Sequence, residues 1–153
     1  MIRVRDLFET HLMVADVDRA IGFYRDVIGL RLAHVTPARH AAFFWVGEAG
    51  QAMLGLWTTS GPQILRLHTA FHTELTDVIA APSALRSAGI TPLDFDGRPT
   101  DQPVVLAWMP AAAVFFHDPD GNLLEYIAML AHEPRRDCGV VPWNMWEALQ
   151  SVS

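Results

Sequence analysis

The stretch His117–Leu130, HDPDGNLLEYIAML, places a tight turn directly in front of an apolar run. Asp, Pro and Gly are typical turn residues, and the run that follows has the length and composition of a strand. One acidic residue, Glu125, lies inside this run. Because burying an unpaired carboxylate is costly, Glu125 needs a partner, which the rest of the chain must supply.

Upstream of this turn, the second half of the chain alternates between strand-like and helix-like patterns. The stretch 74–89 predicts a helix that ends at Gly89, with Pro82 expected to kink or break it. The stretch 96–110 is compatible with an extra strand around Val104–Trp108 or with a loop over a pocket. The remaining stretches with a strand pattern are 65–73, 90–95, 112–118 and 122–130.

The first half shows the same order of patterns. Apolar and polar residues alternate from Glu9 to Val14, which predicts a strand. Asp16 or Asp18 can cap the helix predicted over 17–29, and Gly29 is a typical residue at a helix end. Three strand-like runs follow, over 30–35, 41–47 and 52–59.

The two halves therefore form an internal repeat, which points to two fused βαβββ modules. We expect an α+β fold in which both modules build a curved, mostly antiparallel sheet around a metal and substrate cavity, with the helices outside. The predicted domain spans 1–130, with module one over 7–60, module two over 64–130 and a tail over 131–153. The residues SGPQ at 60–63 would connect the modules.

Superposing the strand ends of the two halves pairs His11 with His68, and Gly55 with Glu125. If all four positions face inward, they contribute two imidazoles, one carboxylate and one position without a side chain. Two His and one carboxylate match non-haem Fe(II) sites, and three protein ligands are also usual in catalytic zinc sites. We therefore predict one divalent metal, Fe, Mn, Zn or Ni, held by His11, His68 and Glu125.

Simpler interpretations exist for each residue of this set. A single His on an apolar strand is more often a packing or edge residue than a ligand. Glu125 could form a salt bridge with Arg3 or Arg31. His72, four residues after His68, is either a surface residue or a group that reaches the same cavity as a general base.

Several apolar or small residues would line the pocket, because they lie two residues from the predicted ligands on the same strands or close to them. Such a wall suits a small organic substrate, aromatic ones included. The predicted pocket residues are Met13, Phe43, Gly55, Trp57, Trp108 and Ile127.

Composition restricts the classes of partner. Hydrophobic residues make up 51% of the 153 residues and charged residues 18%, so a packed core can form. The formal net charge of -6 argues against nucleic acid as a partner. A single cysteine, Cys138, is compatible with a reducing cytoplasm, and no stretch has the length or hydropathy of a signal peptide or a membrane span.

The quoted motifs resemble the vicinal oxygen chelate superfamily, which includes glyoxalase I, extradiol dioxygenases, fosfomycin-resistance enzymes and bleomycin-binding proteins. The resemblance covers about residues 7–130. It lies in HLMVADVDRAIGFYRDVIGLRL, in LHTAFHT and in FFHDPDGNLLEYI, whose Glu corresponds to a metal ligand. It implies that His11, His68 and Glu125 occupy ligand positions.

Three departures leave the activity open. Glyoxalase I has a fourth ligand, a Glu, where this chain has Gly55. Fosfomycin-resistance enzymes usually carry Thr where this chain has Met13, and Tyr126 should point away from Glu125, unlike the pocket Tyr of extradiol enzymes. The reaction of a metal-dependent enzyme could therefore be that of a lyase, an isomerase, a thiol transferase or a dioxygenase. The alternative is a metal-free protein that sequesters a ligand, like the bleomycin-binding members.

The tail at 131–153 lies beyond the resemblance. Trp143, Trp146 and Leu149 form one stripe of a short amphipathic helix. We expect this helix to cover its own domain; a subunit contact in a homodimer is the alternative.

Overall fold

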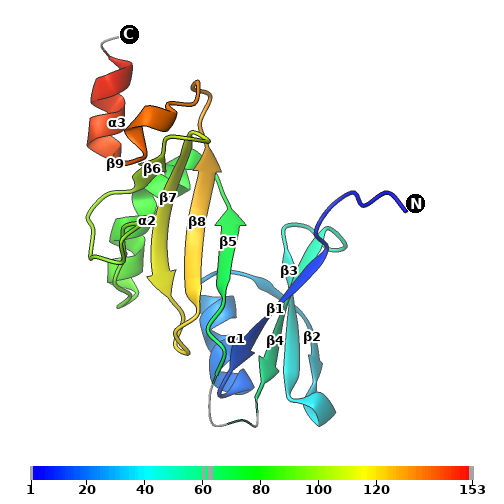
Figure 1. The fold of residues 1–153 in the computed structure, drawn as a ribbon. Helices are drawn as coiled ribbons and strands as arrows, with labels where there is room; N and C mark the ends of the chain where they lie inside the picture. Colours follow the sequence, from blue (N-terminus) through cyan, green and yellow to red (C-terminus); the bar gives the residue numbers. More distant parts are fainter. Residues whose placement is uncertain (1, 60, 62–63, 152–153) are drawn as a thin grey trace. The chain divides into compact units, whose positions relative to one another are not determined.

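A computed structural model describes residues 2–59, 61 and 64–151 (Figure 1). The chain divides into two compact units. The first comprises Met1–Leu67 and Asp118–Asn122, and the second comprises His68–His117 and Leu123–Ser153. The connector expected at 60–63 lies outside the described residues, apart from Gly61.

The first unit is a four-stranded sheet with one helix. Strand β1 is parallel to β4, and β4, β3 and β2 follow in antiparallel order. The helix begins after Asp16, whose side chain accepts a hydrogen bond from the Arg19 backbone N–H, as the capping pattern predicts. The elements are β1 (Glu9–Val14), α1 (Val17–Asp26), β2 (Arg31–Thr36), η1 (Pro37–Arg39), β3 (Ala41–Val46) and β4 (Ala52–Thr58).

The alternation of residues along these strands separates the two faces of the sheet. Leu12, Val14, Phe44 and Leu56 are fully buried, as is Tyr24 of α1. The residues between them, including His11 and Trp57, point to the opposite face because successive strand residues alternate. The helix therefore covers the apolar face, and the predicted site residues of this unit lie on the other.

The second unit is a five-stranded sheet in the order β5-β8-β7-β6-β9. Strands β5 and β8 are parallel, and the other neighbours are antiparallel. The elements are β5 (His68–His72), α2 (Leu75–Ser87), β6 (Val104–Leu106), β7 (Ala111–His117), β8 (Leu123–Met129), η2 (Arg136–Cys138), β9 (Val140–Pro142) and α3 (Trp143–Gln150).

The expected α+β class and the mostly antiparallel pairing are confirmed, but the strands form two open sheets, of four and five strands, instead of one. The first four neighbours in the second sheet, β5-β8-β7-β6, reproduce the order β1-β4-β3-β2. Each unit therefore contains one βαβββ motif.

The prediction of a strand over 90–95 is wrong. Only Leu93 pairs there, through isolated bridges to Pro99 and to Phe115, the latter with N–O distances of 2.7 and 3.0 Å. Pro92 has no backbone N–H, and the Asp94 side chain accepts from the N–H groups of Asp96 and Arg98, which closes a turn. Of the two alternatives for 96–110, the strand is correct: β6 (Val104–Leu106) is the first of the four strands that follow α2.

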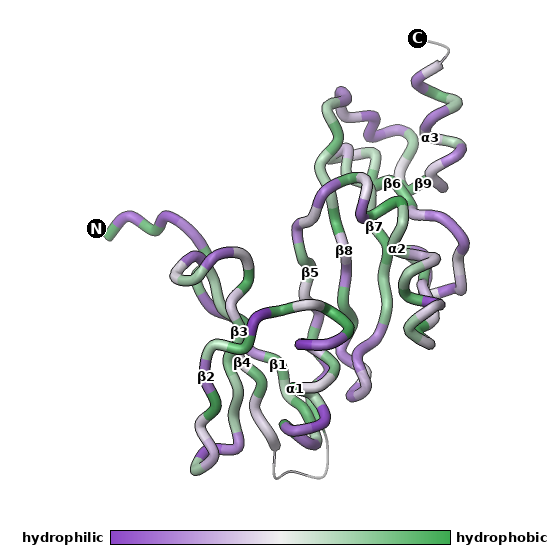
Figure 2. Tube along the Cα trace, turned by 180° about the vertical axis from the view of Figure 1, so that it is seen from behind, coloured by the Kyte–Doolittle hydropathy of each residue, from purple (hydrophilic) through white to green (hydrophobic). Residues whose placement is uncertain are grey.

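Helix α2 runs through Pro82 without a break, so of the two expected effects of Pro82, a kink or a break, the break is wrong. Pro82 is buried, as are Val78 and Leu85 on the same helix. Packing against β7 and β8 offsets the missing backbone hydrogen bond. Figure 2 shows hydrophobic residues along most of β7, in line with its position inside the sheet.

The last part of the chain belongs to the second unit. Strand β9 pairs with the edge of β6, and Trp146 of α3 is fully buried in a cluster with Val78 and Val105. The Trp146 indole N–H donates to His132 Nδ1 at 3.3 Å. The tail thus completes the core of its own unit.

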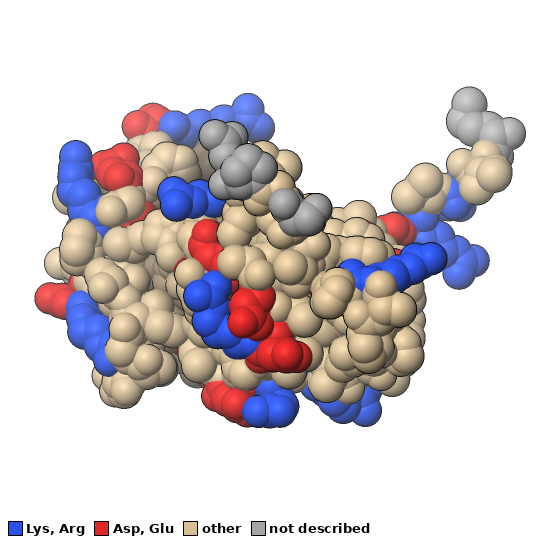
Figure 3. All heavy atoms as spheres, turned by 90° about the horizontal axis from the view of Figure 1, so that it is seen from below, with Lys and Arg blue, Asp and Glu red and all other residues tan. Residues whose placement is uncertain are grey.

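All 11 basic residues of the chain are arginines. On the face drawn in Figure 3, basic and acidic side chains are interspersed among uncharged ones. Within the described part of the chain, none of the helices is long and apolar enough to cross a membrane.

Candidate metal and substrate site

His68 and Glu125 form a close pair in the second unit. They lie on the parallel strands β5 and β8, and His68 Nε2 is 3.1 Å from Glu125 Oε2. Half of the His68 side chain is exposed, whereas the Glu125 residue is 5% exposed. The buried carboxylate therefore contacts one imidazole.

The Glu125 carboxylate is only partly satisfied by this contact. Burial raises the pKa of the Glu125 carboxyl, and attraction by His68 opposes that rise. Oxygen Oε1 is buried and has no hydrogen-bond partner among the described residues. An imidazole beside a carboxylate with one free oxygen offers two donors of the types that Mn, Fe, Zn and Ni prefer.

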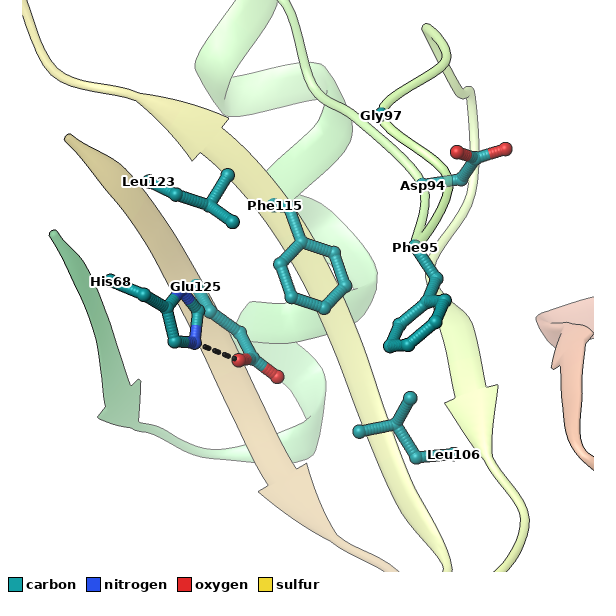
Figure 4. A pocket seen from close by; sticks show the side chains of 8 residues that line it. All are labelled: His68, Asp94, Phe95, Gly97, Leu106, Phe115, Leu123 and Glu125. Carbon is teal, nitrogen blue, oxygen red and sulfur yellow. Dashed lines mark hydrogen bonds and ion pairs between the residues drawn. The ribbon is translucent and has the colours of Figure 1, made fainter. Parts of the chain in front are cut away.

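The pair borders a cavity of about 350 Å³ in the second unit. Figure 4 shows the Glu125 carboxylate beside the rings of Phe115 and Phe95, which are T-shaped at 6.1 Å, while the Asp94 carboxylate points away. Most of the wall is apolar, with the ionisable pair at one side. The lining residues are His68, Asp94, Phe95, Gly97, Leu106, Phe115, Leu123 and Glu125.

In the first unit, the His11 imidazole lies over Gly55 of the neighbouring strand. The two residues are in register, and a Cβ atom at position 55 would be 2.5 Å from His11 Cδ2. Phe43 and Trp57 flank the imidazole at centroid distances of 6.3 and 5.6 Å. His11 Nε2 is 2.9 Å from Oε1 of Glu9.

The DPDG turn and the following Asn122 form a polar network with the first unit. Asp118 accepts from the Tyr24 hydroxyl at 2.8 Å and from the Asn122 side-chain amide at 2.9 Å. Asn122 also donates to the Met13 carbonyl at 3.0 Å and accepts from the Leu67 N–H at 3.0 Å. Asn122 thus bonds to the backbone next to both predicted histidine ligands, two residues from His11 and one from His68.

The other predicted pocket residues and His72 lie in different parts of the two units. Met13 lies opposite Trp57 in the first sheet, and Ile127 packs on a cluster that contains Phe115. Trp108 is 53% exposed in a turn, and His72 is exposed at the end of β5. Among residues 2–59, 61 and 64–151, the ionisable ligands gather as two pairs, and no group of three is close enough to hold a metal ion.

Sequence reasoning missed Glu9, Phe95 and Phe115. Strand alternation could have found Glu9, which shares a face with His11, and Phe115, which pairs with Glu125 as Phe43 pairs with Gly55. Phe95 lies in a turn that no periodic pattern marks.

The strand register of the two units differs. Gly55 lies opposite His11, whereas Glu125 lies opposite Ala70, and His68 lies opposite Leu123. When His11 is superposed on His68, Gly55 therefore corresponds to Leu123 by register. Glu125 lies two residues further along its strand. The His68–Glu125 contact is diagonal across the strands, which a long carboxylate side chain can span.

Comparisons with known proteins agree with this fold. A probable lactoylglutathione lyase of Vibrio parahaemolyticus is 29% identical over 129 residues, which cover 79% of this chain and 88% of the relative. An integron cassette protein from the Halifax Harbour sewage outfall metagenome has 26% identity and a TM-score of 0.69, covering 82% of this chain and all of its own. A lactoylglutathione lyase from Agrobacterium tumefaciens has 23% identity and a TM-score of 0.61, covering 80% of this chain and 92% of its own, and shares the fold.

The family model for the glyoxalase/bleomycin resistance protein/dioxygenase superfamily matches residues 6–126, which is most of the chain: the first βαβββ motif and the second as far as the middle of β8. This chain belongs to the glyoxalase/bleomycin resistance protein/dioxygenase superfamily.

Proposed function

We propose that this protein is a metal-dependent enzyme that acts on a small organic molecule, with His11, His68 and Glu125 as metal ligands. The observation that carries the proposal is the His68–Glu125 pair, in which a buried carboxylate keeps one oxygen without a partner at the wall of an apolar cavity. A buried carboxylate oxygen without a hydrogen-bond partner lowers the stability of the folded protein, and a bound cation would offset that cost.

A bound divalent metal would supply Lewis acidity, which polarises oxygen atoms of the substrate and stabilises negative charge on them. The chain's own residues would position the substrate. Phe95, Phe115 and Leu123 offer an apolar surface next to Glu125, which suits a substrate with an aromatic or aliphatic part beside its oxygen atoms. His72 is proposed as a general base, since it follows His68 at the end of β5.

Among the reactions of this superfamily, the relative named a probable lactoylglutathione lyase favours lyase chemistry on a thiol adduct. Dioxygenation stays the alternative within the proposal. A cytoplasmic location, consistent with the single cysteine, and a homodimer are parts of the same proposal.

A metal-free protein that sequesters an apolar ligand is the second candidate. The cavity of about 350 Å³ and the 57% exposed Phe95 at its wall favour it, because such a wall binds apolar ligands without a metal.

Metal content separates the two candidates. The purified protein is stripped with a chelator, reloaded with Fe(II), Mn(II), Zn(II) or Ni(II), and analysed by plasma mass spectrometry. We expect about one metal per chain, with loss in His68→Ala and retention in the control His34→Ala, whose side chain is on the exposed side of β2. Less than half a metal per chain with every ion, together with tight binding of an apolar dye such as anilinonaphthalene sulfonate, would favour the sequestering protein.

A further inference from the structure

The cavity beside the His68–Glu125 pair has a neighbour on the same face of the second sheet. Val104 and Leu106 are separated by one position on β6, so both side chains lie on one face. Leu106 lines the cavity of about 350 Å³, and Val104 lines a second cavity of about 270 Å³. The residues that line the second cavity are Asp94, Phe95, Asp96, Arg98, Val104, Val140, Val141 and Pro142.

Phe95 lies at the wall of both cavities. Among the described residues only Asp94 and Phe95 line both, and the Asp94 carboxylate points away from the first cavity (Figure 4). The Phe95 ring contacts the Phe115 ring at a centroid distance of 6.1 Å, with the two planes at 73°. Phe95 is therefore the side chain that separates the two cavities.

The turn that carries Phe95 is held by backbone contacts. Leu93 exchanges two hydrogen bonds with Phe115, and the Asp94 N–H donates to the Arg98 carbonyl at 2.8 Å. The Asp94 carboxylate accepts from the Arg98 N–H at 2.8 Å. The backbone at Phe95 is thus fixed without its side chain, which is 57% exposed, so Phe95→Ala should keep the turn and remove only the wall.

The charges around both cavities indicate an uncharged ligand. None of the described residues that line the first cavity is an arginine, and its carboxylates belong to Glu125 and Asp94. In the second cavity the Arg98 guanidinium donates to the Asp96 carboxylate at 2.9 Å, which compensates its charge. A ligand that carries a carboxylate or a phosphate would therefore meet acidic side chains without an unpaired guanidinium.

The rings of Phe95 and Phe115 favour an aromatic group in the ligand. Two rings that meet almost at right angles form a corner, in which a third ring stacks on one and meets the edge of the other. Small-molecule sites usually have about 300–1,000 Å³, so the first cavity is at the lower end of this range and the second is below it. The second cavity therefore suits an extension of a ligand better than a separate ligand.

We infer that Phe95 determines ligand length in the second unit. With Phe95 in place, the first cavity receives a compact, uncharged aromatic group; without this side chain, the cavity beside β9 extends the site for a longer one. Strand β9 lies beyond the family match at 6–126, so the extension depends on the tail of this chain. The inference rests on the proposed function in taking this ligand to be the substrate, but the binding itself needs no metal.

Fluorescence titrations of the chelator-treated protein with two uncharged probes test the inference. The probes are naphthol, which has two fused rings, and Nile red, which is longer. In Phe95→Ala the affinity for naphthol should fall at least about threefold, because a ring contact is lost, and the affinity for Nile red should rise at least about fivefold, because the cavities join. Met145→Ala is the matched control, since Met145 is an exposed apolar residue of the same unit that lines neither cavity.

Two variants then fill the second cavity from β9. Val140→Phe and Pro142→Phe are each combined with Phe95→Ala, and Pro142 is exposed, so its replacement leaves the core intact. Either substitution should cancel the gain in affinity for Nile red and leave the affinity for naphthol as in Phe95→Ala. Thermal unfolding of each variant verifies that it is folded.

Several results would overturn the inference: a wild type that binds neither probe, a Phe95→Ala variant whose two affinities change in the same direction, or a gain for Nile red that survives both β9 substitutions. Naphthoate, the anionic counterpart, should bind at least about tenfold more weakly than naphthol, and equal binding would contradict the uncharged ligand. Metal uptake is measured separately, so these failures leave the proposed metal site standing, and failed metal uptake leaves the result for Phe95 unchanged.

Discussion

At the residue scale, the two glutamates differ in what surrounds them. Glu125 is 5% exposed, whereas about a third of the Glu9 side chain is exposed. Burial raises the pKa of the Glu125 carboxyl, so its charged form is held at a free-energy cost in the metal-free protein. A cation that binds the free oxygen Oε1 would offset that cost.

Gly55 gives a prediction at the same scale. In Gly55→Ala the new Cβ would lie 2.5 Å from the His11 ring, so the imidazole must move. The ring is half-exposed and can give way, so we expect a stability loss of about 1 kcal/mol, but a fall in metal affinity of at least tenfold.

Gly22→Ala is the control for this prediction. Its new Cβ has open space on helix α1, and Ala favours a helix by about 0.5–1 kcal/mol over Gly. Thermal unfolding and metal titration of both variants check the prediction, and unchanged metal affinity in Gly55→Ala would contradict it.

At the element scale, the turn after β7 belongs to the first unit and is held there by Asn122. In Asn122→Ala three hydrogen bonds of a fully buried side chain are lost, to Met13, Leu67 and Asp118. We expect a loss of about 2–4 kcal/mol in the free energy of unfolding, because the partners stay buried. Urea denaturation measures this, and a loss below about 1 kcal/mol would show that the network contributes little.

Tyr24 of α1 gives a prediction on pH. Burial, followed by the nearby Asp118 carboxylate, raises the pKa of the Tyr24 hydroxyl far above its usual value of about 10. Above that value the unfolded chain releases the Tyr24 proton and the folded chain keeps it, so stability falls by about 1.4 kcal/mol per pH unit for this proton.

Tyr24→Phe tests this pH dependence. The variant should be less stable than the wild type at neutral pH, since the hydrogen bond to Asp118 is lost. Its stability should fall less steeply above pH 10, and the remaining slope should include Tyr126, whose pKa burial raises to about 12. Denaturation curves between pH 7 and 11 with parallel slopes for both proteins would contradict the prediction.

The elements also show what the sequence could predict and where it failed. Regular alternation from Glu9 to Val14 and the Asp16 cap predicted β1 and α1 because burial and capping act locally. The segment 90–95 has a strand composition, but Pro92 and the Asp94 turn leave only Leu93 able to pair, and these effects depend on neighbouring strands. The repeat grouped His68 and Glu125 in one predicted ligand set. Their direct contact and the two-residue difference in register were not predicted, because register is set between strands.

At the scale of the whole molecule, the last strand and helix lie beyond the family match at 6–126 and still form part of a core. Trp146 is fully buried, so Trp146→Ala should cost about 3–5 kcal/mol. Trp108→Ala, at a position 53% exposed, should cost less than about 1 kcal/mol. Guanidinium denaturation measures the free energy of unfolding of both variants. A loss in Trp146→Ala as small as that expected for Trp108→Ala would mean that the tail adds little to the stability of its unit.

The central proposal is that His11, His68 and Glu125 are the ligands of one bound metal. A crystal structure of the Mn(II)- or Zn(II)-loaded protein, with anomalous scattering measured at the metal edge, tests it most directly. The account predicts one anomalous peak per chain, about 2.0–2.3 Å from Nε2 of His68, a carboxylate oxygen of Glu125 and Nε2 of His11. A peak at other residues, or a loaded crystal in which the Glu125 carboxylate contacts no metal, would contradict it.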